Sequence, residues 1–178
     1  KSHLNGEKHM MTPEKCIQIQ NDLGSDIVMQ LDVCTEYGTS YEDSKKALER
    51  THLWLGRCFE AQKNPKQMLF PIVQGNIYPD LRLKSLELAK PYVKCGIAIG
   101  GLSVGEPKEK MYEILDVLKD KLPENSPHYL MGVGSPDCII EGVLRGIDMF
   151  DCVLGTRIAR NGTAMTSQGK VVVRNGKY

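Results

Sequence analysis

The segment GIAIGGLSVGEPKEKMYEILDVLKDKL, from Gly96 to Leu122, contains one complete strand–turn–helix unit. Residues 96–102 form a short apolar run that ends in glycines, which is typical of a buried strand. Along Lys108–Leu122 the apolar side chains recur at the three- and four-residue spacing of one helix face, at Met111, Ile114, Leu115 and Leu118. A strand followed by such a helix is the building unit of a parallel α/β fold.

The same unit recurs along the chain. Five strand candidates are DIVMQLD (26–32), LFPIVQG (69–75), GIAIGGL (96–102), HYLMGVG (128–134) and MFDCVL (149–154). Each is a continuous apolar run rather than a strict alternation of apolar and polar residues, which predicts parallel strands covered on both faces.

Three of the intervening segments have recognisable helix starts. Thr12-Pro13-Glu14 and Ser135-Pro136-Asp137 each place a capping side chain before a proline at the first helical position. Ser40–Asp43 resembles a capping box with Asp in the acid position. The helix that it opens should bury one face, made of Tyr41, Ser44, Leu48, Leu55 and Phe59. Further on, AMTSQGKVVVRN predicts a hairpin that turns at Gln168-Gly169.

Strand–helix alternation predicts a parallel sheet with right-handed crossovers, and both an open doubly wound sheet and a TIM (β/α)8 barrel satisfy it. The barrel is favoured because polar or glycine positions recur at the strand ends, where barrel enzymes place their chemistry. These positions are Asp32, Gln74, Gly100-Gly101, Met131-Gly132 and Asp151. A complete barrel takes about 250 residues, so five strands predict an incomplete barrel whose remaining strands lie elsewhere in the natural protein.

Bulk composition fits one globular domain. The chain has 178 residues, of which 41% are hydrophobic and 25% charged. No apolar run approaches the roughly 20 residues of a membrane span, so we expect no membrane association. Six cysteines never come closer than fourteen positions, and no CxxC pair or histidine spacing predicts a metal site within the chain. Reduced thiols in a cytoplasmic protein are therefore expected.

Positive charge is concentrated near the end of the chain. No Asp or Glu occurs from Cys152 to Tyr178, whereas the basic residues there are Arg157, Arg160, Lys170, Arg174 and Lys177. In a protein whose net charge is only +1, this stretch is either a site for phosphates or a solvated tail.

Two aspartates are the first candidates for chemistry. Asp32 and Asp151 each end an apolar run, so both carboxylates are expected at the same rim of the sheet. An Asp after a strand also commonly caps the next helix or turn, and for either residue alone that structural role stays open.

Other features follow the remaining strands. Gln74 offers an amide that donates and accepts, and AIGGLSVGEP (98–107) is a glycine-rich bend with exposed backbone N–H groups, as in phosphate loops and plain turns alike. Met131 can be core packing or a ligand contact. Cys34 and Cys152 have no neighbouring His that would support a nucleophile, so packing is their expected role.

A carboxylate, an amide, bare backbone and a thioether together suit a purine-like base. A carboxylate accepts hydrogen bonds from the N1–H and amino edge of guanine, while an amide or backbone N–H meets its O6. A second carboxylate beneath the sugar could attack the anomeric carbon and form a glycosyl-enzyme.

Long segments of the chain resemble the bacterial tRNA-guanine transglycosylase family, also called queuine tRNA-ribosyltransferases. They are MQLDVC, FPIVQG, AIGGLSVGEPKEKMYEIL, YLMGVGSP and MFDCVLGTRIARNGTAMTSQG, and the resemblance covers essentially residues 1–178. It implies a (β/α)8 barrel with a zinc-binding insertion, of which this chain is the central to C-terminal part. The implied reaction exchanges guanine at the wobble position of tRNA for the precursor base preQ1, in queuosine biosynthesis.

By motif, the resemblance implies roles for individual residues. Asp151 matches the covalent nucleophile, and Asp32 matches the carboxylate that reads the guanine edge, with Cys34 beside it. Further base contacts match Gln74, Gly100, Gly101, Leu102, Tyr129 and Met131. Arg157 and Arg160 match arginines that contact the anticodon loop. Val104 is the bacterial-type residue at its position.

The chain also departs from the family. Gly155 stands where a proline is usual, and two family segments are absent: an upstream DSGGFQ-like motif with a second catalytic aspartate, and the downstream Cys/His zinc site. The family implies tRNA, guanine and preQ1 as partners, a homodimer and zinc in the full-length protein. Two alternatives stay open: a non-catalytic tRNA-binding subunit or inactive fragment, and a metabolic barrel enzyme with a phosphate loop at 98–106.

Overall fold

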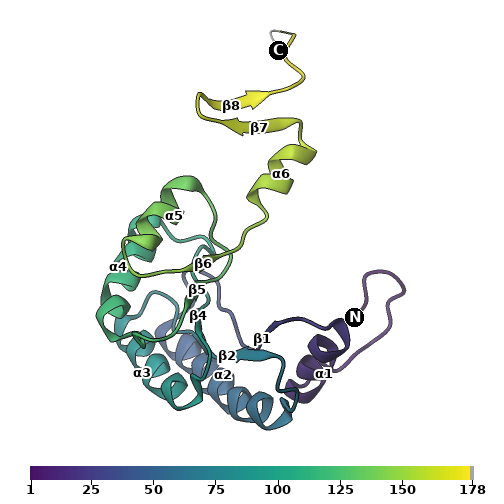
Figure 1. Ribbon diagram of the computed structural model, residues 1–178, viewed down its shortest axis with the longest axis vertical. Coiled ribbons are helices and arrows are strands. Elements are labelled where there is room, and N and C mark those ends of the chain that lie inside the picture. Colours follow the sequence, from purple (N-terminus) through teal and green to yellow (C-terminus); the bar gives the residue numbers. More distant parts are fainter. Residues whose placement is uncertain (177–178) are drawn as a thin grey trace.

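A computed structural model describes residues 1–176 of the chain (Figure 1). Its helices lie along the outside of an arc of short strands, and the last helix and a hairpin project away from that arc. The α-helices are α1 (Pro13–Leu23), α2 (Tyr41–Ala61), α3 (Pro79–Ala89), α4 (Lys108–Leu118), α5 (Pro136–Val143) and α6 (Leu154–Arg160). The strands are β1 (Ile27–Met29), β2 (Met68–Phe70), β3 (Ile72–Val73), β4 (Ile97–Ile99), β5 (His128–Leu130), β6 (Met149–Phe150), β7 (Thr163–Thr166) and β8 (Gly169–Val172).

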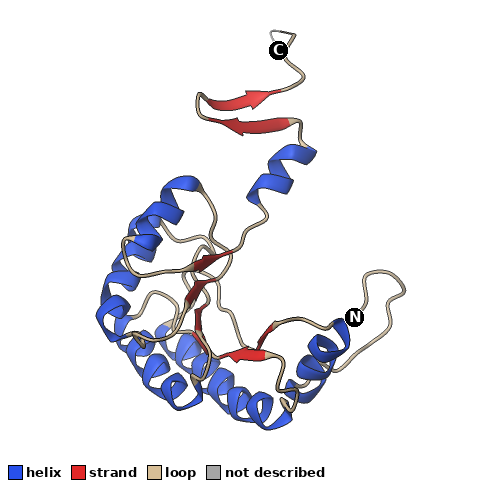
Figure 2. Ribbon diagram, in the orientation of Figure 1, coloured by secondary structure: helices blue, strands red, loops and turns tan. Residues whose placement is uncertain are grey.

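The strands of the arc are all parallel (Figure 2). Strand β1 pairs with β2, and β3, β4, β5 and β6 pair in that order. Only Pro71, which has no N–H to donate, separates β2 from β3. Its carbonyl still accepts from the Ala98 N–H at 2.9 Å, so the two short strands continue one path through the sheet.

The α/β class with parallel strands is thus confirmed. Across residues 1–176 the strands form an open, curved row and not a closed barrel. All five predicted strand runs contain strand, although each strand is shorter than its run. The run 149–154 was too long as a prediction: the strand ends at Phe150, and Leu154 already begins α6.

The predicted helix starts are confirmed at all three sites, and the predicted capping side chain makes its hydrogen bond at two of them. Thr12 Oγ1 accepts from the Lys15 N–H at 3.2 Å, and Ser40 Oγ accepts from the Asp43 N–H at 3.2 Å. Ser135 occupies the N-cap position of α5, but its side chain makes no capping hydrogen bond, so that part of the prediction is wrong.

Three further details differ from the predictions. The helix from Lys108 ends at Leu118, and a 3-10 turn, Lys119–Lys121, continues it. On α2, Ser44, Leu48 and Leu55 are buried, whereas Tyr41 is exposed and Phe59 only partly buried because both lie near the ends of the helix. The hairpin turns at residues 167–168, one position early, because Thr166 pairs with Gly169.

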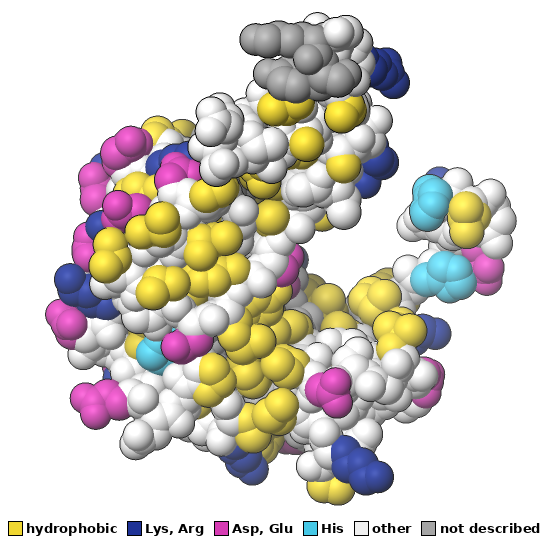
Figure 3. Space-filling view, turned by 45° about the horizontal axis from the view of Figure 1, so that its top comes forward, with side chains coloured by type: hydrophobic (Ala, Val, Ile, Leu, Met, Phe, Trp, Pro, Cys, Tyr) yellow, Lys and Arg dark blue, Asp and Glu magenta, His cyan; other side chains and the backbone are white. Residues whose placement is uncertain are grey.

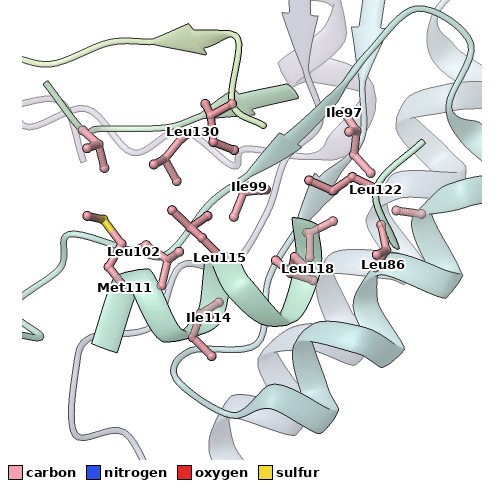
Figure 4. Close-up of a cluster of buried hydrophobic side chains, with 14 of the residues drawn as sticks. Leu86, Ile97, Ile99, Leu102, Met111, Ile114, Leu115, Leu118, Leu122 and Leu130 are labelled. Atoms are coloured by element: carbon pink, nitrogen blue, oxygen red, sulfur yellow. The ribbon is translucent and has the colours of Figure 1, made fainter. Parts of the chain in front are cut away.

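The main core lies between the sheet and the helices α3, α4 and α5. Figure 4 shows Ile97, Ile99 and Leu130 from the strands facing Leu115 and Leu118 from α4. A smaller cluster of Ile17, Val28, Cys58 and Leu69 fastens α1 and α2 to the first two strands.

The inner face of the sheet carries its own cluster. Phe70, Ile72 and Ala98 are buried there, and Tyr129 and Met131 pack against them. Successive residues of a strand point to opposite faces, so Ile97 and Ile99 enter the outer core while Ala98 faces inward. This two-sided burial explains the continuous apolar runs. In Figure 3, hydrophobic side chains gather over the middle of the face that it shows.

No helix among residues 1–176 is long and apolar enough to cross a membrane.

Candidate active site

One cavity of about 360 Å³ collects every residue predicted to contact a base, together with the predicted nucleophile. It lies at the carboxyl ends of the parallel strands, since every lining residue except Tyr129, which lies within β5, follows a strand. The predicted residues that line it are Asp32, Cys34, Gln74, Gly100, Gly101, Leu102, Tyr129, Met131 and Asp151. Val104 and Gly132 line it as well.

Asp151 follows β6 directly, and one of its two carboxylate oxygens is held in place. Oδ1 accepts from the Tyr129 hydroxyl at 2.6 Å and from the Gly132 N–H at 2.7 Å. Within residues 1–176 no group donates to Oδ2, and the side chain is exposed. Burial, and then the hydrogen bond to Asp151, raise the pKa of Tyr129, so its hydroxyl stays protonated and donates. The free oxygen can therefore act as a nucleophile from a fixed carboxylate.

Asp32 lies three residues after β1 and lines the same cavity as Asp151. Its Oδ2 accepts from Gln74 Nε2 at 2.6 Å. Burial raises the pKa of Asp32, and the hydrogen bond from Gln74 partly opposes that shift. Partial burial and the neighbouring Asp32 also raise the pKa of Cys34, so at neutral pH its thiol is protonated and is not a nucleophile.

The backbone of Gln74 is held by a hydrogen bond to a residue that sequence reasoning did not identify, and a second such residue contacts the first. The Gln74 backbone N–H donates to Ser85 Oγ at 2.9 Å, and His52 Nε2 lies 2.7 Å from the same hydroxyl. Burial lowers the pKa of His52 to about 4, so the ring is neutral at physiological pH. No sequence signal marks this pair, because Ser85 and His52 meet only through the packing of α2 against α3.

The glycine turn after β4 packs directly under the Gln74 side chain. A Cβ at Gly100 would lie 2.8 Å from Gln74 Nε2, and one at Gly101 would lie 2.2 Å from Gln74 Oε1. Gly101 also has φ +64°, a left-handed conformation that favours glycine. Both positions therefore need glycine for a structural reason.

We predict that Gly101→Ala displaces the Gln74 side chain and weakens the guanine binding expected in this cavity by about tenfold, the effect of losing one hydrogen bond of about 1.4 kcal/mol. Titration of the full-length protein with guanine measures this. Gly146→Ala is a matched control, because Gly146 also has positive φ (+81°) but a Cβ there meets nothing within 4 Å. Equal affinity in the Gly101 and Gly146 variants would contradict the prediction.

Arg82 is the largest fully buried side chain and lies behind the same turn. Its guanidinium donates to four backbone carbonyls: Asn76 at 2.6 Å, Val73 at 3.1 Å, Gly100 at 2.6 Å and Gly101 at 2.9 Å. Burial lowers its pKa to about 9, so Arg82 is charged at neutral pH. Sequence reasoning missed this residue because a helix arginine normally faces solvent.

Met131 belongs both to the packed interior and to the cavity wall, and its predicted contact with a ligand stays a prediction. Its side chain packs against the inner cluster, and it also lines the cavity. Leu102 is 2% exposed and belongs to the outer core, which leaves mainly its backbone to the cavity wall.

The two predicted tRNA-contacting arginines lie outside this cavity, on α6. Arg157 lines an adjacent cavity of about 280 Å³ that also includes Lys108, Gly132 and Cys152. Arg160 is exposed one turn further along. Lys170 and Arg174 follow on the exposed hairpin segment, whereas Lys177 lies outside the described residues. Gly155 has open space around its Cα, so the residue that departs from the family pattern creates no crowding.

Metal-binding side chains do not converge in the described structure. Within residues 1–176 no group of three or more His, Cys, Asp or Glu residues could hold a metal ion. The six cysteines are free thiols.

Known proteins similar to the chain were found by two comparisons. The family model described as queuine tRNA-ribosyltransferase matches residues 1–178. Among curated proteins, queuine tRNA-ribosyltransferases from Acetivibrio thermocellus and Thermoanaerobacter sp. are 58% and 57% identical to the chain. That from Desulforamulus reducens is 55% identical. Each alignment covers 100% of this chain and 48% of the relative, so the chain spans about half the length of these proteins.

Proposed function

The chain belongs to the queuine tRNA-ribosyltransferase family, and from this membership we propose that the protein is a tRNA-guanine transglycosylase. It exchanges guanine at the wobble position of tRNA for preQ1, through a covalent ribosyl-aspartate. The observation that carries this proposal is the cavity in which Asp151, with one free carboxylate oxygen, and Asp32 line the same space.

The proposed chemistry is a double displacement at C1′ of the ribose. Asp151 Oδ2 attacks C1′, the bond from C1′ to the base nitrogen N9 breaks, and its electron pair leaves with guanine, which then takes up a proton. The incoming base next attacks C1′ through its own ring nitrogen and loses a proton, and the C1′–Oδ2 bond breaks to restore the carboxylate. Two inversions retain the configuration of the sugar, as in retaining glycoside chemistry.

The other side chains of the cavity hold the base. Asp32 accepts hydrogen bonds from the N1–H and amino group of guanine, and Gln74 and the glycine turn meet O6. Met131 lies against one face of the ring, and Tyr129 keeps Asp151 Oδ1 occupied so that Oδ2 faces the sugar. The chain carries no DSGGFQ-like segment, so the second catalytic aspartate and the other half of the base clamp are assigned to sequence beyond residues 1–178.

Several wider features belong to the same proposal. We place residues 1–178 in the central to C-terminal part of a (β/α)8 barrel, whose open row of strands here would be continued by further strands. Zinc is expected in the full-length protein, but the described residues offer no ligand set for it, and no step above uses it. A homodimer acting in the cytoplasm completes the proposal.

A single incubation tests the proposed reaction. The full-length protein is mixed with tRNA that carries guanine at the wobble position and with radiolabelled guanine or preQ1. Label in the RNA is expected, and a covalent RNA–protein adduct should be trapped on a denaturing gel. A non-catalytic tRNA-binding protein would retard the RNA on a native gel but give neither label nor adduct, and that outcome would refute the proposal.

The basic residues of α6 predict salt-dependent tRNA binding. Arg160→Ala should weaken tRNA binding and lower the slope of log affinity against log salt by about 0.7 to 1, the loss of one phosphate contact. Affinity for free guanine should not change, because Arg160 does not line the base cavity. Arg50→Ala, an exposed arginine on α2, is the matched control. An unchanged salt slope in the Arg160 variant would count against this RNA contact.

A further inference from the structure

In the glycine turn after β4, residues 100–104, some backbone N–H groups have a protein acceptor and others do not. Glu106 accepts from the Ser103 N–H and from the Val104 N–H, the latter at 2.9 Å. Within residues 1–176 the N–H groups of Gly101 and Leu102 have no protein acceptor. Both of these residues line the base cavity. Two adjacent N–H groups without a partner at a cavity wall form a site for an oxygen acceptor.

Arg82 determines the direction of these two N–H groups. A trans peptide unit is planar, and its C=O and N–H point in opposite directions. The Gly100 and Gly101 carbonyls both point to the buried guanidinium, at 2.6 and 2.9 Å. The following N–H groups, of Gly101 and Leu102, are therefore turned away from Arg82, toward the cavity side of the turn.

The same guanidinium also hydrogen-bonds to the backbone on both sides of Gln74. It holds the Val73 carbonyl just before Gln74, and the Asn76 carbonyl two residues after it. In the described part of the chain no carboxylate hydrogen-bonds to Arg82, since all four acceptors are backbone carbonyls. Within residues 1–176 Arg82 forms no salt bridge, and the nearby Glu106 carboxylate raises its pKa only against the larger effect of burial. A positive charge that Glu106 balances only in part therefore stands behind the dipoles of the turn.

We propose that Arg82 is a positioning residue that builds the acceptor site for O6 of the exchanged base, by orienting the Gly100–Leu102 peptide units and adding its charge behind them. This inference rests on the proposed function. Negative charge develops on the base, and partly on O6, as the C1′–N9 bond breaks, so the same arrangement would stabilise the leaving base. Arg82 itself touches neither base nor sugar.

The test compares bases that differ only at the recognised atom. Dissociation constants for guanine and 6-thioguanine are measured with the full-length wild type, Arg82→Lys and Arg82→Gln, because sulfur is a weaker hydrogen-bond acceptor than oxygen. Lysine keeps a charge but cannot reach four carbonyls, and glutamine keeps hydrogen bonding without charge. Arg50→Lys is the matched control on the surface of α2, and thermal unfolding shows which variants fold.

We expect each folded Arg82 variant to bind guanine about tenfold more weakly, the equivalent of one good hydrogen bond, with a clearly smaller loss for 6-thioguanine. Hypoxanthine, which keeps O6 but lacks the amino group, should lose as much as guanine. An equal loss for guanine and 6-thioguanine, or no loss at all, would overturn the role of Arg82.

The wild type alone also tests the acceptor site. Guanine should slow hydrogen exchange at the Gly101 and Leu102 amides, and unchanged exchange in a guanine-saturated protein would overturn the proposal even if neither Arg82 variant folded. Failure of the wild type to bind any purine would instead refute the proposed function, so the two failures are distinguishable.

Discussion

Asp151→Ala is expected to abolish base exchange in the full-length protein, with a rate lowered by about 10⁴-fold or more, as for other covalent nucleophiles. The side chain is exposed and contributes little to the core, so the variant should fold. It should still bind tRNA and free guanine, because Asp32 and the glycine turn remain. Incorporation of labelled guanine into tRNA, and trapping of the covalent adduct, measure the loss.

Tyr129→Phe is the matched control for this prediction. It removes one of the two donors to Asp151 Oδ1 but leaves the Gly132 N–H in place, so we expect a far smaller loss of rate. Retained exchange in Asp151→Ala would exclude this carboxylate as the nucleophile. Asp151→Asn is less decisive, because slow deamidation regenerates the acid.

Asp32→Asn should have the second largest effect, a decrease in guanine affinity of about 10³-fold. A carboxylate accepts two hydrogen bonds from the guanine edge, and each hydrogen bond to a charged group contributes about 1.5–3 kcal/mol. The amide of Asn would instead place its NH2 group, a donor, against one of the two guanine donors. Hypoxanthine, which lacks the amino group, should be penalised less than guanine. Equal penalties for the two bases would contradict the assignment of Asp32 to the N1–amino edge.

Lowering the pH should weaken guanine binding, because Asp32 becomes protonated, but should increase the contribution of Asp32 to folding stability. Burial raises its pKa above 3.8, so guanine affinity should fall with decreasing pH in a range above that of a free carboxyl. A raised folded-state pKa means that Asp32 contributes least to stability when it is ionised, at pH values above the folded pKa. At neutral pH, Asp32→Asn should therefore melt no lower than wild type. A lower melting temperature would attribute the lost affinity to unfolding.

The fold class could be predicted from the sequence because strands that are buried on both faces of a sheet appear as continuous apolar runs. Strand β4 within the run 96–102 is apolar throughout, since Ala98 packs inward while Ile97 and Ile99 enter the outer core. Strand ends could not be predicted, because glycine and apolar residues continue past the last paired residue. Phe150 and Leu154 belong to one apolar run, yet a turn at Asp151–Val153 divides them between a strand and a helix.

Residues at the carboxyl ends of strands could likewise be identified, because chain order and parallel pairing bring them to one rim. Asp32 and Gln74 are 42 positions apart, and both follow predicted strands. The supporting residues behind them could not be found in this way. Arg82, Ser85 and His52 lie on ordinary helices, and only the packing of α2 and α3 onto the sheet turns them toward the site.

In the proposed function, the cavity offers one carboxylate for the base edge, Asp32, and one for the sugar, Asp151. The outgoing and incoming bases of the proposed reaction would then need the same contacts, and the first must leave before the second can bind. Steady-state kinetics should accordingly give parallel double-reciprocal lines for tRNA and the incoming base, with free guanine competing against preQ1. If the proposed ribosyl-aspartate forms in both directions, the supply of each base should set which way the exchange runs.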